Sequence, residues 1–154
     1  MITEGVLSNI ICNRLIFLFT ANADKYQKNK MNWTTHLPEK PDYLAPDGSE
    51  IRLLPNLKGG GLCHCVLPCD GISKAVTHKT VDEVWYFISG QGVVWRKADN
   101  IEEEIPVKAG ICITIPVGTH FQFKNIGKEP LEFIILTSPC WPGADEAVPV
   151  TGKY

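Results

Sequence analysis

The sequence has almost no excess charge of either sign, and this argues against several classes of partner. Lysine and arginine number 15 against 17 aspartates and glutamates, so the 154-residue chain carries a formal net charge of −2. Nucleic-acid binding needs a basic surface that neutralises phosphates, and binding to an anionic membrane needs a cluster of basic residues. The charge balance therefore predicts no nucleic-acid partner and no membrane partner.

Cysteine is too sparse for a fold that disulfides hold together. The chain has six cysteines, which is below the density of disulfide-rich domains. Cys63 and Cys65 would lie on one face of a strand, where they cannot readily bridge each other. We expect most cysteines to be reduced and packed, which predicts a cytoplasmic protein. The run CHCVLPC lacks zinc-finger spacing, and no second cluster completes a four-ligand site.

A long uninterrupted apolar run is also missing. The most apolar stretch, VLSNIICNRLIFLFTANA, is split by Arg14 and is too short to cross a bilayer. Its apolar residues recur with a helical period, which predicts an amphipathic helix. The alternative is a signal peptide over residues 1–23, and the protein would then be exported. We expect residues 1–30 to be an N-terminal extension and residues 31–154 to form a single domain, with Met31 as an alternative translation start.

After residue 31 the helical period gives way to short apolar runs separated by turn residues. Nine runs rich in β-branched and aromatic residues follow one another: EIRLL, GLCHCVL, SKAVT, EVWYFIS, GVVWRK, IEEEIPV, ICITIP, HFQFKN and LEFIILT. SGQG and KADN between them have the composition of tight turns. Strands at this spacing are typical of an all-β sandwich or a small antiparallel β-barrel. We expect the tail SPCWPGADEAVPVTGKY to lie against the barrel, with Trp141 as its anchor.

Two motifs in the strand region are similar to those of the cupin superfamily. In the first, Glu83 is followed by six residues and Gly90, and His78 stands where the second histidine of the family's pair belongs. In the second, Gly110 is followed by five residues, a Pro-Val-Gly turn and, further along, Asn125. The chain thus resembles a single-domain cupin of the type-2 conserved barrel kind. The resemblance implies a double-stranded β-helix, a jelly-roll-like antiparallel barrel with a small-molecule site inside.

Two of the family's four metal-ligand positions carry other residues in this sequence. Val76 stands at the first histidine of the pair and Phe121 at the late histidine of the second motif. Two other histidines, one on the preceding predicted strand and one beside Phe121, are candidates to replace the missing ligands. The predicted metal-ligand set is therefore His64, His78, Glu83 and His120. Regular strand alternation would instead turn His120 outward, and a buried histidine at 64 is as readily a hydrogen-bonded core residue.

Glu83 is the residue that the strand pattern marks as functional. Alternation puts Glu83, Trp85 and Phe87 on one face of their strand. A carboxylate that faces a barrel interior is costly unless it is paired or bound to a metal. His78, five positions earlier, reaches the same place only if the chain bends through KTVD. The residues predicted to line the pocket are Trp85, Phe87, Phe121, Phe123 and Arg52.

These features predict a cupin-barrel protein that binds one divalent metal ion (Fe, Mn, Ni, Cu or Zn) and a small organic ligand. The resemblance implies a metalloenzyme of the dioxygenase, isomerase or lyase type, with Glu83 as a ligand or base. The alternative is a metal-free cupin that binds or senses a small molecule, and the apolar Val76 and Phe121 favour it. A third possibility is a structural dimer with a filled barrel. Fold alone does not decide whether the protein is an enzyme. Apolar side chains on the opposite strand face, Val84, Tyr86 and Ile88, predict a homodimer.

Overall fold

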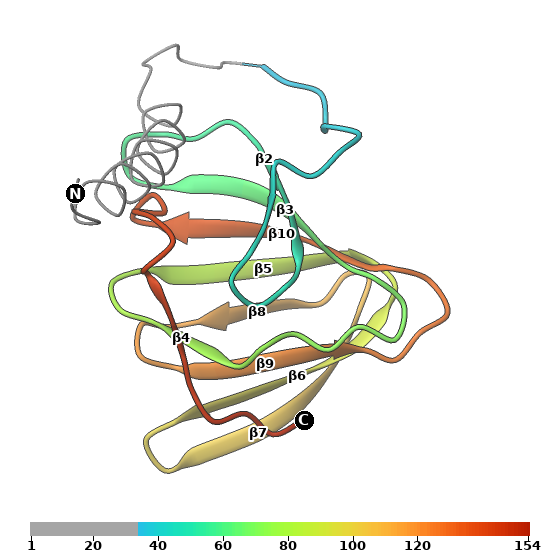
Figure 1. Ribbon diagram of the computed structural model, residues 1–154, viewed down its shortest axis with the longest axis vertical. Helices are drawn as coiled ribbons and strands as arrows, with labels where there is room; N and C mark the ends of the chain where they lie inside the picture. The colour runs from blue at the N-terminus through green and yellow to red at the C-terminus, as the bar shows by residue number, and fades with distance from the viewer. Residues whose placement is uncertain (1–33) are drawn as a thin grey trace, which may run out of the picture. The chain divides into compact units, whose positions relative to one another are not determined.

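The computed structural model describes residues 34–154, which form two antiparallel sheets (Figure 1). The sheet with six strands has the order β1-β2-β3-β10-β5-β8, and the sheet with five strands has the order β11-β4-β9-β6-β7. The strand bounds are β1 Tyr43–Leu44, β2 Glu50–Leu53, β3 Gly61–Leu67, β4 Val76–His78, β5 Asp82–Ser89, β6 Gln91–Ala98, β7 Ile101–Lys108, β8 Cys112–Ile115, β9 His120–Asn125, β10 Leu131–Ser138 and β11 Ala147–Pro149.

The all-β barrel-like fold predicted from the sequence is confirmed. Each of the nine predicted runs overlaps a strand, and only the short strands β1 and β11 were not foreseen. No helix occurs in residues 34–154, so none of this part can cross a membrane as a long apolar helix. The described residues belong to one compact unit, Asn32–Tyr154. The predicted helix or signal peptide of residues 1–30 lies outside the described residues.

The hairpins form at the turn residues that the sequence indicated. Gly90, between β5 and β6, has a φ of +76°, and a Cβ there would collide with the backbone of Pro130 and Leu131. Only glycine fits such a close approach without strain. Asp99, between β6 and β7, has a φ of +50°, a conformation that aspartate tolerates better than most residues. These two tight turns place β5, β6 and β7 one after another.

Aromatic rings fill the space between the two sheets. Burial alternates along β5 and β10, as expected for strands with one face toward a core. The ring of Trp85 lies 4.8 Å from that of Phe133 and 5.2 Å from that of Phe123, measured between centroids. Such rings each bury about 150–250 Å² and dominate the energetics of a core. The fully buried aromatic residues are Trp85, Phe87, Phe121, Phe123 and Phe133.

The C-terminal segment closes one side of the five-stranded sheet. β11 pairs with β4, and Ala147 stands opposite His78. The backbone N–H groups of Lys153 and Tyr154 both donate to Oε1 of Gln122 at 2.9 Å. Trp141 packs against the core, as predicted for the anchor of the tail. The tail is therefore part of the fold rather than an appendage.

We predict that a chain that begins at Met31 folds into the same barrel. Every strand of the described residues lies beyond that position, so the truncation removes none of their backbone pairing. The measurement is a comparison of circular dichroism spectra and melting temperatures between the full chain and the truncated chain. An insoluble truncated chain, or one that melts far lower, would show that residues 1–30 contribute to the core or to an interface.

Candidate functional site

Two ionisable residues meet at one end of the barrel interior. His78 is the last residue of β4, and Glu83 is the second residue of β5. Both are 5% exposed, and Nδ1 of His78 lies 4.0 Å from Oε1 of Glu83. Thr137 stands opposite Glu83 on β10 and bonds to Gly61 across the sheet. The polar end of the barrel, defined as His78, Glu83 and Thr137, is thus enclosed by the aromatic core on one side.

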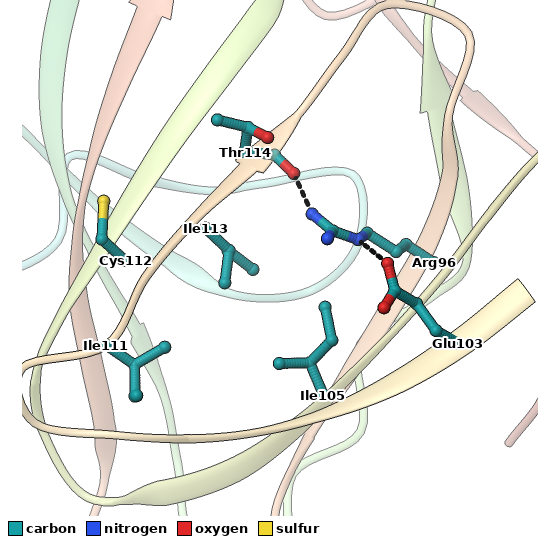
Figure 2. A pocket seen from close by; sticks show the side chains of 7 residues that line it. All are labelled: Arg96, Glu103, Ile105, Ile111, Cys112, Ile113 and Thr114. Atoms are coloured by element: carbon teal, nitrogen blue, oxygen red, sulfur yellow. Dashed lines mark hydrogen bonds and ion pairs between the residues drawn. The ribbon is translucent and has the colours of Figure 1, made fainter. Parts of the chain in front are cut away.

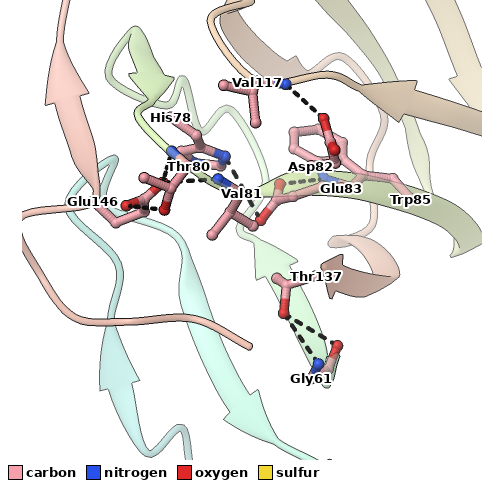
Figure 3. A network of polar contacts seen from close by, with 10 residues as sticks. All are labelled: Gly61, His78, Thr80, Val81, Asp82, Glu83, Trp85, Val117, Thr137 and Glu146. Carbon is pink, nitrogen blue, oxygen red and sulfur yellow. Dashed lines mark hydrogen bonds and ion pairs between the residues drawn. The ribbon is translucent and has the colours of Figure 1, made fainter. Parts of the chain in front are cut away.

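The turn between His78 and Glu83 is held by a residue from the distant C-terminal segment (Figure 3). Oε1 of Glu146 accepts from the backbone N–H groups of Thr80 at 2.6 Å and Val81 at 2.9 Å, and its Oε2 accepts from the Thr80 hydroxyl. Burial alone would raise the pKa of Glu146, but these hydrogen bonds outweigh burial, and the pKa is lowered. Glu146 is therefore an anion that fixes the bend on which the approach of His78 to Glu83 depends.

We expect Glu146→Gln to lower the free energy of unfolding by about 1.5–3 kcal/mol, the range for hydrogen bonds to a charged group. The amide is isosteric, so the loss reflects the charge. Asp145→Asn is the matched control, because Asp145 is exposed and its partner within residues 34–154 is Lys79, also at the surface. Such surface pairs contribute little. Denaturant unfolding of both variants measures the difference, and equal effects would refute the role given to Glu146.

Glu83 is held as a neutral acid near neutral pH. Burial raises its pKa to about 8, against the opposing effect of a hydrogen bond from the indole Nε1 of Trp85 to Oε2 at 2.7 Å. Desolvation disfavours the carboxylate because the aromatic interior offers little to replace its hydration. The second oxygen, Oε1, faces His78. Glu83 therefore has a proton that it can donate near pH 7.

His78 is held as a neutral base over the same range. Its ring makes edge-on contacts with Phe121 and Trp141, each at 5.0 Å between centroids. Burial lowers its pKa to about 4, although the charge of Glu146 acts in the opposite direction. Nδ1 is buried and has no hydrogen-bond partner within the described part of the chain. The two residues are thus not an ion pair at pH 7 but a neutral acid beside a neutral base.

The other two predicted metal ligands lie on outer sheet faces. His64 is buried, but it alternates with Cys63 and Cys65, which face the core, and its Nε2 bonds to Glu132 Oε2 at 3.0 Å. His120 stands opposite Lys97 and alternates with the inward-facing Phe121. Both strands run regularly through these positions, so no bulge rotates either imidazole inward. The structure brings together His78 and Glu83 and leaves the other two histidines apart.

The residues predicted to line the pocket also divide into those that face the barrel interior and one that faces outward. Four of them, Trp85, Phe87, Phe121 and Phe123, face the interior, where they pack against one another. Arg52 does not face the interior. It stands opposite His64 on the outer face, and it donates to the carbonyl oxygen of Pro38 and to the Glu50 carboxylate. Arg52 therefore fastens the segment that precedes β1 and does not line a pocket.

The residues present do not fit the metal expected from the resemblance. A mononuclear zinc site takes three or four donors from side chains, and a non-heme iron site takes two histidines and one carboxylate. Only two donors converge here, since Val76 and Phe121 occupy the positions where the family has histidines. Among residues 34–154, no group of three or more His, Cys, Asp or Glu side chains is placed to hold a metal ion. The titratable side chains that converge at this end are therefore His78 and Glu83.

Sequence reasoning missed the part that Glu146 plays at this site. Glu146 follows Asp145 in a tail rich in proline and glycine, where acidic residues are usually solvated. Only the docking of the tail on β4 puts one of the two carboxylates inside and the other outside. No local sequence signal distinguishes the buried Glu146 from the exposed Asp145, because their burial depends on pairing with a strand some seventy residues away. The bend through KTVD, by contrast, was readable from the spacing.

The comparisons with known proteins agree with this architecture. A model of the cupin domain matches residues 64–137. The uncharacterized protein MJ1618 of Methanocaldococcus jannaschii is 32% identical over 111 residues, which are 69% of this chain and 86% of that protein.

Solved structures with a similar fold share less sequence. A predicted oxalate decarboxylase from Thermotoga maritima is 19% identical with a TM-score of 0.57, over 68% of this chain and 99% of that one. The nucleoside dehydratase Pac13 from Streptomyces is 15% identical with a TM-score of 0.59, over 76% and 91% of the two chains. At these identities the likeness concerns the fold alone. The two motifs, the double-sheet barrel and these matches together place the chain in the cupin superfamily.

Proposed function

We propose that this cupin binds a small polar organic molecule at the polar end of its barrel and acts on it without a metal ion. His78 and Glu83 serve as a general base and a general acid. The observation that carries the proposal is that burial moves their pKa values in opposite directions, to about 4 and about 8. Titratable neighbours whose environments separate their pKa values are typical of acid–base sites.

In the proposed reaction the substrate loses one proton to His78 and gains one proton from Glu83. Nδ1 of His78 takes a proton from the substrate, and Glu83 gives its own proton to a carbonyl or departing hydroxyl oxygen. The products at the site are an imidazolium and a carboxylate 4.0 Å apart. Transfer of the proton from His78 back to Glu83 restores both neutral groups. This balance suits an isomerisation or the elimination of water, and it needs no oxidant.

In the proposed function, a substrate reaches His78 and Glu83 from the side on which Trp141 covers His78. The Trp141 ring packs edge-on against His78 and is half-buried, while the core rings close the opposite side. The segment between β10 and β11 that carries Trp141 has no strand pairing of its own. In the proposed function this segment moves aside to admit the substrate, and its return excludes water from the reacting groups.

Binding and turnover by metal-stripped protein test the proposal. The first probe is uridine, because the Streptomyces dehydratase of similar fold has been solved with uridine. After dialysis against EDTA, saturation-transfer NMR measures binding, and deuterium uptake from D2O into the probe reports proton abstraction. We expect binding that persists in EDTA, and we expect deuterium uptake to be lost in His78→Ala and Glu83→Gln. Binding or turnover that requires added metal would support the metalloenzyme instead.

We also propose that the protein forms a homodimer through the outer face of the six-stranded sheet. Four apolar side chains on β5 and β10 are 37–49% exposed there: Val84, Tyr86, Ile88 and Leu136. Val84 and Leu136 stand directly opposite each other, so the exposed residues form one patch rather than scattered points. Contiguous apolar patches on a soluble protein commonly mark an interface.

We expect the wild type to sediment as a dimer at micromolar concentration and Tyr86→Glu to sediment as a monomer. A charge in the centre of an apolar contact would be desolvated without a partner, which weakens association. Ile101→Glu is the matched control, since Ile101 is exposed at the start of β7 on the other sheet. A monomeric wild type, or equal dissociation in both variants, would rule out this interface.

A further inference from the structure

A pocket lies at the edge of the barrel, and neither His78 nor Glu83 is among the residues that line it (Figure 2). Its volume is about 420 Å³, within the range of sites for small metabolites. It opens between β7 and β8, which are end strands of the two sheets formed by residues 34–154. The lining residues are Arg96, Glu103, Ile105, Ile111, Cys112, Ile113 and Thr114. We call this hollow the edge cleft.

The guanidinium of Arg96, which lines the edge cleft, has hydrogen-bond donors that are not used within the described part of the chain. Nε of Arg96 donates to Oε1 of Glu103 at 2.7 Å, and Nη1 donates to the backbone oxygen of Thr114 at 2.6 Å. A guanidinium has five N–H donors, and these bonds use two of them. Nη2 makes no hydrogen bond with any residue in 34–154. Figure 2 shows the guanidinium beside the apolar side chains of the cleft.

We propose that the edge cleft binds a small monocarboxylate with an apolar body. The carboxylate accepts hydrogen bonds from Arg96, whose planar fork matches the two carboxylate oxygens. The apolar body packs on the side chains of Ile105, Ile111 and Ile113, which come from both edges of the cleft. A dicarboxylate is disfavoured, since the isoleucines offer no partner for a second charge.

The edge cleft is separate from the polar end of the barrel. On β9, Phe121 stands opposite Arg96, and its ring contacts those of His78 and Trp85. On β5, Trp85 stands opposite Ile113. Two buried rings thus lie between the two places. The proposal does not depend on the function proposed above, and either can fail alone.

The ion pair between Glu103 and Arg96 predicts the direction in which a substitution at Glu103 changes ligand affinity. The Glu103 carboxylate accepts a hydrogen bond from the same guanidinium that would bind the ligand, so Glu103 and the ligand compete for Arg96. Glu103 lies on the edge strand β7, and its side chain is 42% exposed, so it can turn toward solvent. Removal of its charge should therefore tighten the binding of a carboxylate, whereas loss of a merely structural contact would not.

Amide-shift NMR titration of the full chain with 4-methylpentanoate tests the site, with the uncharged 4-methylpentanamide as the control probe. We expect shifts at residues 105 and 111–114, and weaker binding of the amide. Glu103→Gln should raise affinity for the carboxylate several-fold, and Arg96→Gln should lower it by about tenfold or more, the effect of losing a charged hydrogen bond. Neither change should alter affinity for the amide by a similar factor.

The comparison of carboxylate and amide on the wild type does not rely on the variants folding well. Equal binding of carboxylate and amide, unchanged affinity in Glu103→Gln, or shifts confined to residues around His78 would each overturn the proposal.

Discussion

The wild-type protein is expected to lose about 2 kcal/mol of stability between pH 6.5 and pH 8, and Glu83→Gln is expected to lose none of it. In the unfolded chain Glu83 releases its proton near pH 4.5, but in the fold it keeps the proton up to about pH 8. Between these values unfolding releases one proton, so a rise in pH favours the unfolded state. The slope for one proton is about 1.4 kcal/mol per pH unit.

His78 contributes the opposite slope at lower pH. Its pKa falls from 6.5 in the unfolded chain to about 4 in the fold, so unfolding takes up a proton between these values. Stability from this group is complete above pH 6.5 and is lost as the pH falls toward 4. Between pH 4.5 and 6.5 the two slopes have opposite signs and cancel. The pair therefore predicts a plateau in that window, with losses on both sides.

Urea unfolding at half-unit pH steps measures both arms. Glu83→Gln keeps an oxygen that can accept from Trp85 Nε1, so the variant should match the wild type near pH 4, where Glu83 is protonated in both states, and should exceed it by a growing margin up to pH 8. The difference between the two curves isolates Glu83 from every other titrating group. Parallel curves from pH 6.5 to 8 would mean that Glu83 is already ionised in the fold, and the acid role proposed for it would fail.

The fold was predictable from the sequence because its signals are local. Period-two alternation and turn residues such as Gly90 mark where strands start and stop, and neither depends on distant contacts. The short strands β1 and β11 escaped notice because their two and three residues are too few to show a period. They exist because neighbouring strands, β2 and β4, present free edges for them to pair with.

The site was only partly predictable, since it combines residues that are distant in the sequence. The spacing between His78 and Glu83 revealed the bend between them, and alternation put Glu83 inside. Proximity in sequence was a poor guide for His64 and His120, because strand alternation carries both outward in spite of their inward-facing neighbours. The same rule of alternation, applied strictly, would have removed both from the ligand set.

Histidines placed at positions 76 and 121 are expected to create a metal site with His78 and Glu83. Val76 and Phe121 stand directly opposite each other on β4 and β9, and both are buried. Val76 shares its strand face with His78, and the Phe121 ring touches the His78 ring. Imidazoles at the two positions would therefore join His78 and Glu83, so that three nitrogens and one carboxylate face one point, which is a complete donor set for zinc or cobalt.

Val76→His/Phe121→His should melt below the wild type in EDTA, because two imidazoles are buried without partners and the edge-on contact of Phe121 with Trp85 is lost. A metal that binds only the fold restores stability by about 4 kcal/mol at a thousand times its dissociation constant. Cobalt absorption and metal content after dialysis should show about one ion per chain. The same variant with His78→Ala added is the control and should retain far less metal.

If the double variant takes up no metal, these four positions do not converge as described. If the wild type takes up as much as the double variant, its ligands come from elsewhere in the chain, and the metal-free mechanism must be abandoned.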